Sequence, residues 1–208
     1  MLSLDTMATF LAASILLGLA PGPDNLFVMS QSALYGRMSG MIVLAGLCTG
    51  LVVHTAAVAL GVAVIFQSSA VAFTVLKIAG AAYLAVLAWQ AFRSRGADLA
   101  IAATGTTSCR HLYLRGILMN ITNPKVSLFF LAFLPQFAEP GRGPVIIQLA
   151  LLGGLFIVAT LVVFGGMVFL AGGLGELLKR SPRLRQLLGK ATGVIFLGLA
   201  LKLAVAER

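Results

Sequence analysis

Six apolar segments, five of them longer than 20 residues, account for most of this chain of 208 residues. About 20 apolar residues in a helix cross the hydrocarbon core of a membrane. The chain is 60% hydrophobic and 10% charged, whereas soluble domains are roughly 45–50% apolar. The sequence therefore predicts an all-α, polytopic membrane protein with six transmembrane helices and no room for a soluble domain. The expected spans cover residues 2–35, 38–66, 70–92, 112–137, 145–171 and 191–206.

The first and fourth spans are each interrupted by proline, and a charged residue follows each interruption. Proline has no amide proton and disfavours helix at the residue before it, so each span should stop and restart. Proline suits the first position of the restarted helix, and Asp24 suits its first turn because of the helix dipole. Residues 2–20 carry no Lys or Arg and precede a proline, so we expect a retained helix rather than a cleaved signal peptide. The predicted helix-breaking residues are Pro21, Gly22, Pro23 and Pro124.

Asp24 and Lys125 are charged residues within predicted spans, where a charge costs free energy unless it faces protein or water. Their presence therefore suggests a functional role. Two broken spans in corresponding positions are typical of transporter binding sites. A carboxylate and an ammonium together suit a zwitterionic solute, and Lys125 would then contact the solute carboxylate. The alternatives are a capping role for Asp24 and a purely structural cation in Lys125. The predicted substrate-binding residues are Asp24, Asn25, Asn120, Asn123 and Lys125.

Proton coupling has two candidates in the sequence. Asp24 is the clearest carboxylate within a span, and His54 in the second span is the other group able to carry a proton. A packed, hydrogen-bonded histidine is the alternative for His54.

The spans divide into two sets of three: repeat 1 is about 1–92, a cytoplasmic loop is about 93–111, and repeat 2 is about 112–208. An odd number of spans inverts the second repeat relative to the first. Aligning Leu26 with Leu128 places Pro21 over Asn123 and leaves the two charges one residue out of register. Helical rise places both charges roughly 15–20 Å from the cytoplasmic boundary, near the midplane. If residues 2–20 alone span the membrane, the first break lies near the cytoplasmic face instead.

Basic residues predict the orientation, because cytoplasmic loops are enriched in Lys and Arg. The loops after the first, third and fifth spans hold ten of the fifteen basic residues. Odd-numbered loops should therefore be cytoplasmic, with both termini outside. The ten are Arg37, Arg93, Arg95, Arg110, Arg115, Lys179, Arg180, Arg183, Arg185 and Lys190.

The sequence resembles the lysine exporter (LysE/RhtB) family of amino-acid exporters over its full length. The segments that carry the resemblance are Pro21–Asn25, Gly36-Arg37, Lys77–Leu84, Arg115-Gly116, Asn123–Lys125 and, most specifically, Phe129–Phe137. The resemblance implies a six-helix inner-membrane protein of bacteria that exports amino acids or derivatives, driven by the proton gradient. Threonine, homoserine, homoserine lactone, basic and branched-chain amino acids all occur as solutes in such a family, so the motifs do not name one.

Other function classes are weaker. The net charge of +9 lies at span ends and does not indicate nucleic-acid binding. Cys48 and Cys109 form no metal or redox motif, although a membrane thiol-redox protein is an alternative. A metal-ion exporter or channel is another, but Asp24 and His54 alone would coordinate a cation poorly. We expect no enzyme activity, no cofactor and no metal site; a homo-oligomer is compatible with the sequence.

Overall fold

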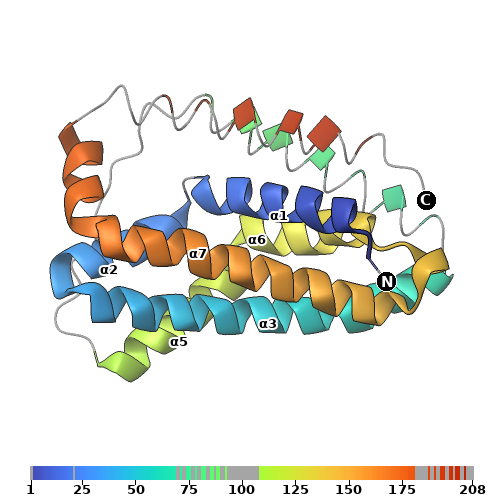
Figure 1. Ribbon diagram of the computed structural model, residues 1–208, viewed down its shortest axis with the longest axis horizontal. Coiled ribbons are helices and arrows are strands. Elements are labelled where there is room, and N and C mark those ends of the chain that lie inside the picture. The colour runs from blue at the N-terminus through green and yellow to red at the C-terminus, as the bar shows by residue number, and fades with distance from the viewer. Residues whose placement is uncertain are drawn as a thin grey trace.

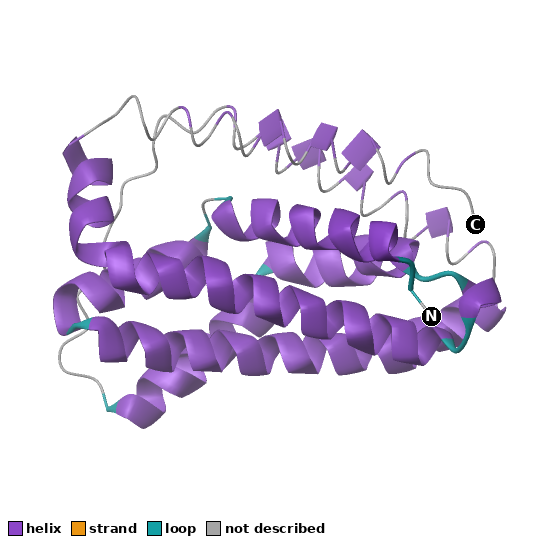
Figure 2. Cartoon of the chain, viewed as in Figure 1, coloured by secondary structure: helices purple, strands orange, loops and turns teal. Residues whose placement is uncertain are grey.

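The computed structural model describes residues 2–20, 22–68 and 108–180, together with isolated positions between 71 and 92 and between 187 and 204. Within these residues all regular structure is helical (Figures 1 and 2). The predicted third and sixth spans and most of the 93–111 loop fall outside the continuously described segments. The elements are α1 (Leu4–Leu19), α2 (Pro23–Tyr35), α3 (Arg37–Ser68), α5 (Cys109–Thr122), α6 (Pro124–Leu128), η1 (Phe129–Phe133), η2 (Leu134–Phe137), η3 (Pro140–Arg142) and α7 (Val145–Arg180).

Two of these helices are long and apolar enough to cross a membrane alone, over Arg37–Gly61 of α3 and Val145–Ala171 of α7. Two bent pairs can each serve as one span. Helices α1 and α2 meet at 61°, and α5 meets the segment Pro124–Phe137 at 50°. The all-helical architecture and the two interrupted spans are as the sequence predicts. The arrangement of six helices in inverted repeats remains a prediction.

The described helices form an elongated bundle with two distinct ends (Figure 1). The junction of α2 and α3 at Gly36, the start of α5 and the end of α7 lie at one end, here called the Gly36 end. The start of α1 and the turn 138–144 lie at the other, the Glu139 end. This grouping agrees with the charge-based topology for the segments that are described. That the Gly36 end faces the cytoplasm is still a prediction.

A cluster of six phenylalanines fills the half of the bundle towards the Glu139 end. Ring centroids of neighbouring members lie 4.9 to 6.3 Å apart, and each side chain is buried. The cluster joins α1, η1, η2 and α7 across most of the sequence. We call it the phenylalanine core: Phe10, Phe129, Phe130, Phe133, Phe137 and Phe156.

Helix geometry changes beyond Leu128, where the sequence predicts ordinary α-helix to residue 137. The structure has a π-helix at η1 and a 3₁₀-helix at η2. Pro135 has no amide proton and cannot donate to the Leu131 carbonyl, which interrupts the α-helical ladder. The Leu134 amide instead donates to the Phe129 carbonyl, five residues back. Short π segments of this kind frequently occur at functional sites.

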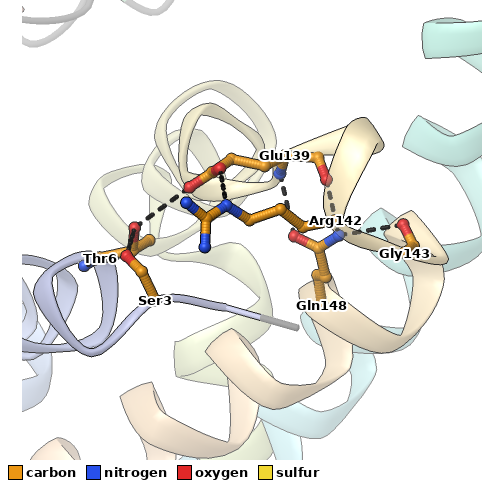
Figure 3. Close-up of polar contacts among 6 residues, drawn as sticks. All are labelled: Ser3, Thr6, Glu139, Arg142, Gly143 and Gln148. Carbon is orange, nitrogen blue, oxygen red and sulfur yellow. Dashed lines mark hydrogen bonds and ion pairs between the residues drawn. The ribbon is translucent and has the colours of Figure 1, made fainter.

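The Glu139 end is closed by a set of polar contacts around a buried glutamine (Figure 3). The Gln148 side chain accepts from the Glu139 amide at 2.9 Å and donates to the Glu139 and Gly143 carbonyls at 2.9 and 3.0 Å. The Glu139 carboxylate pairs with Arg142 and accepts a hydrogen bond from Thr6 Oγ1 at 3.4 Å. These contacts fix the 138–144 turn and connect it to the first turn of α1.

Candidate functional site

The break between α1 and α2 leaves carbonyls of α1 without helical donors, because a helix end always leaves such groups free. Two side chains supply the missing donors. Asn25 Nδ2 donates to the Gly18 carbonyl at 2.6 Å, from the first turn of α2. Lys125 Nζ donates to the Leu17 and Ala20 carbonyls at 3.3 and 3.0 Å, from the other broken span. The two interrupted spans therefore meet at the end of α1.

The break in the fourth span is completed in a similar way. The Asn123 side chain caps α6 by accepting from the Lys125 amide at 3.0 Å. Pro124 cannot donate to the Asn120 carbonyl, which accepts instead from the Asn123 amide at 3.1 Å and contacts His54 Nε2 at 3.3 Å. A carbonyl oxygen only accepts, so Nε2 of His54 carries the proton in this contact.

Both restarted helices begin alike, with proline in the first turn directly before the charged residue: Pro23-Asp24 in α2 and Pro124-Lys125 in α6. The sequence alignment left the charges one residue out of register. Gly22 and Asn123 precede the two prolines as the capping residues. Counted from the start of its own helix, each charge therefore holds the same position, and the two are opposite in sign.

Glycines of α3 bring α5 close to the site. A side chain at Gly46 would overlap the Tyr113 carbonyl, and Gly50 lies directly against Asn120, so the two backbones approach closely. Gly50 lies within the apolar stretch Arg37–Gly61, which is long enough to cross a membrane. The depth of the first break in the membrane remains a prediction.

Asp24 lies at the centre of the predicted site residues. It interacts electrostatically with Lys125 and His54, and the Asn120 and Asn123 side chains face it. Asp24 is 3% exposed and Lys125 is 7% exposed, yet the two do not form a direct ion pair. Asp24 lies in the first turn of α2, where the helix dipole stabilises a carboxylate, as the capping alternative expects.

Buried polar atoms without hydrogen-bond partners concentrate here. Buried groups of this kind are rare in native structures and call for a ligand, a water or a functional reason. Within the described residues such side-chain atoms belong to five residues, four of which the sequence assigns to the site: Asp24 Oδ1, Asn25 Oδ1, Asn120 Oδ1, Asn123 Nδ2 and Gln31 Nε2.

Gln31 and Phe130 are the neighbours that sequence reasoning missed. Gln31 is 1% exposed and follows Asp24 by seven residues, two turns along the same face of α2. A polar residue at that spacing in an apolar helix was the available signal. Phe130 packs on the His54 ring at a centroid distance of 5.5 Å, which joins the site to the phenylalanine core. No sequence pattern marks that contact.

Metal-ligating side chains do not gather in groups of three or more within the described part of the chain. Cys48 and Cys109 are both free thiols. The site that the structure assembles is thus one of amides, a carboxylate, an ammonium and an imidazole.

A comparison with protein families decides what kind of protein carries this site. The sequence model of the family described as "LysE type translocator" matches residues 15–207. The chain belongs to the LysE type translocator family. A translocator is consistent with the expectation that the chain is not an enzyme, and the resemblance found in its motifs is confirmed.

Named relatives of this LysE type translocator include efflux proteins. The chain is 37% identical over 198 residues to the homoserine/homoserine lactone efflux protein of Salmonella typhimurium, covering 95% of both chains. It is 33% identical to an uncharacterized membrane protein of Vibrio cholerae, covering 95% of this chain and 96% of the relative. It is 24% identical to the leucine efflux protein of an Enterobacter species, covering 94% and 93%. No solved structure matches.

Proposed function

We propose that this chain is a secondary transporter that exports amino acids or their derivatives across the bacterial inner membrane. The observation that carries the proposal is the buried, partly unpaired cluster around Asp24, at the point where the two interrupted spans meet. Relatives named for homoserine, homoserine lactone and leucine efflux suggest a small amino-acid-like solute. The residues that form the site are Asp24, Asn25, Asn120, Asn123 and Lys125, within six helices arranged as inverted repeats.

The surroundings of the site differ towards its two ends, which suggests a direction for loading. Towards the Gly36 end, Gln31 continues the polar face of α2 beyond Asp24. Towards the Glu139 end, the described residues next to the site are the packed phenylalanine core and the hydrogen-bonded 138–144 turn. A solute would enter from the Gly36 end, which faces the cytoplasm, and leave once the phenylalanines separate.

Proton antiport would use Asp24, with His54 as the second candidate. Asp24 is the carboxylate that faces both Lys125 and His54 in the described part of the bundle. Proton loading on a buried carboxylate alters its charge, and hence its attraction for a solute, which is what coupling requires. The hydrogen bond from His54 to the Asn120 carbonyl also fits a structural role for this histidine.

The test is an amino-acid profile of bacterial cells fed dipeptides, with and without the protein. Dipeptide hydrolysis raises internal amino acids, and an exporter should lower the internal level of its solute and raise the external level. Cells producing Asp24→Asn at the same membrane level should resemble cells without the protein. An unchanged profile across all amino acids and homoserine would refute the proposal.

A further inference from the structure

The two buried charges of the site differ in the contacts that already hold them. Lys125 Nζ donates to two carbonyls at the end of α1, those of Leu17 and Ala20. The C-terminal end of a helix also attracts a cation through its dipole. Two of the three ammonium donors of Lys125 are therefore used by the protein itself, at a helix end that needs them.

Asp24 is held less directly by the protein. It is 3% exposed and forms no direct ion pair with Lys125. The Asn120 and Asn123 side chains approach its carboxylate as hydrogen-bond donors. Asp24 Oδ1 nevertheless has no hydrogen-bond partner among the described residues. A buried carboxylate oxygen without a donor is costly, so this atom is the part of the site that a ligand can complete.

We propose that Asp24 recognises the solute through its ammonium group, and that Lys125 positions the end of α1 without binding the solute carboxylate. This inference rests on the proposed function and refines its substrate class to primary amines, with or without a carboxylate. An ammonium group brings three donors and a positive charge, and its hydrogen bonds to a carboxylate are stronger than neutral ones.

A solute carboxylate would gain little at this site. Lys125 has one donor left, and the charge of Asp24 repels a second carboxylate strongly in a medium of low dielectric constant. An amino acid and its lactone or amide should therefore bind alike. The analogue with a hydroxyl group in place of the amine should be rejected, because the buried carboxylate then lacks its charged partner.

The test uses the purified protein in liposomes and measures how unlabelled compounds inhibit exchange of labelled homoserine or leucine. The competitors form two matched series: homoserine, homoserine lactone and α-hydroxy-γ-butyrolactone; and leucine, leucinamide and 2-hydroxy-4-methylpentanoate. In the series whose labelled amino acid exchanges, the two amines should inhibit at concentrations within about threefold of each other. The hydroxy compound should be weaker by about 100-fold or more, as for sites that lose a buried polar partner.

Two results would overturn the inference while leaving the proposed function intact. One is a lactone or amide more than about tenfold weaker than its parent amino acid. The other is a hydroxy compound that inhibits as well as the amine. If neither labelled amino acid exchanges, the inference fails, and the proposed function fails with it when the dipeptide profile is also unchanged.

Variants separate binding from positioning in the same assay. Lys125→Gln should lower exchange of the amino acid and of its lactone or amide by the same factor, and should lower the melting temperature. A loss confined to the solute with a carboxylate would show that Lys125 binds that group. Asp24→Asn should abolish exchange of both amines without lowering the melting temperature. Ser30→Ala is the matched control in α2, since among the described residues its hydroxyl donates to the Phe27 carbonyl alone.

Discussion

Replacing Gly50 by alanine tests how the contact between α3 and α5 positions the site. The added Cβ would lie 2.6 Å from Asn120 Oδ1 and 2.7 Å from Asn120 Cβ. Carbon atoms in contact normally lie about 3.5–4.0 Å apart. Rotation of the asparagine side chain cannot move its own Cβ, so α5 must shift away from α3 by about 1 Å to restore that separation.

Two effects of this substitution oppose each other. Overpacking of a close contact typically costs about 1–3 kcal/mol, whereas replacing glycine by alanine within a helix contributes about 0.5–1 kcal/mol of stability. We therefore expect Gly50→Ala to lower the free energy of unfolding by about 0.5–2 kcal/mol. Transport should fall as well, because the shift moves Asn120 away from Asp24 and weakens the contact with His54.

The assay is thermal unfolding of the purified protein in detergent, paired with solute exchange in liposomes. Gly154→Ala in α7 is the control, since an added Cβ there meets nothing within 4 Å. The control should melt at or above the wild-type temperature and transport normally. If Gly50→Ala also melts at or above the wild-type temperature and transports normally, the packing argument is refuted.

Three further predictions address other parts of the structure. Gln148→Ala should lower the free energy of unfolding by about 1–3 kcal/mol, because it leaves buried backbone groups unpaired. Glu139→Gln removes a half-exposed ion pair and should lower it by less than about 1 kcal/mol. Similar melting temperatures for the two variants would contradict this. Pro124→Ala should lower transport, because a restored amide competes for the Asn120 carbonyl and straightens the 50° bend; unchanged transport would show that the bend is dispensable. In a chain lacking Cys48, an impermeant maleimide should label Gly141→Cys but not Cys109 in intact cells, and labelling of Cys109 from outside would overturn the topology.

The interruptions of the spans were predictable from local chemistry. Proline removes an amide donor wherever it occurs, so the restarts at Pro23 and Pro124 follow from the sequence alone. Gly46 and Gly50 lie one turn apart on one face of the second span, a spacing that favours close helix packing, and the structure shows a close contact with α5 there. These features depend on one residue or one helix face.

Features that depend on both broken spans together were not predictable. The bonds from Lys125 to the α1 carbonyls join residues more than 100 positions apart, so they arise only once the two halves pack. The contact of His54 with Phe130 and the π-helix at η1 were likewise not predictable. In that π-helix, packed phenylalanine rings accompany an unusual backbone hydrogen-bond pattern. Sequence reasoning named the predicted site residues but could not tell which contacts each of them makes.

The most direct test of the account is uptake of labelled homoserine and leucine into inverted membrane vesicles with an imposed pH gradient, acidic inside. The wild-type protein should accumulate at least one of them only when the gradient is present. Asp24→Asn, present in the membrane at the same level, should accumulate neither, because the buried carboxylate is the group proposed to bind both the solute and the proton. Wild-type accumulation by Asp24→Asn under the same gradient would contradict the account.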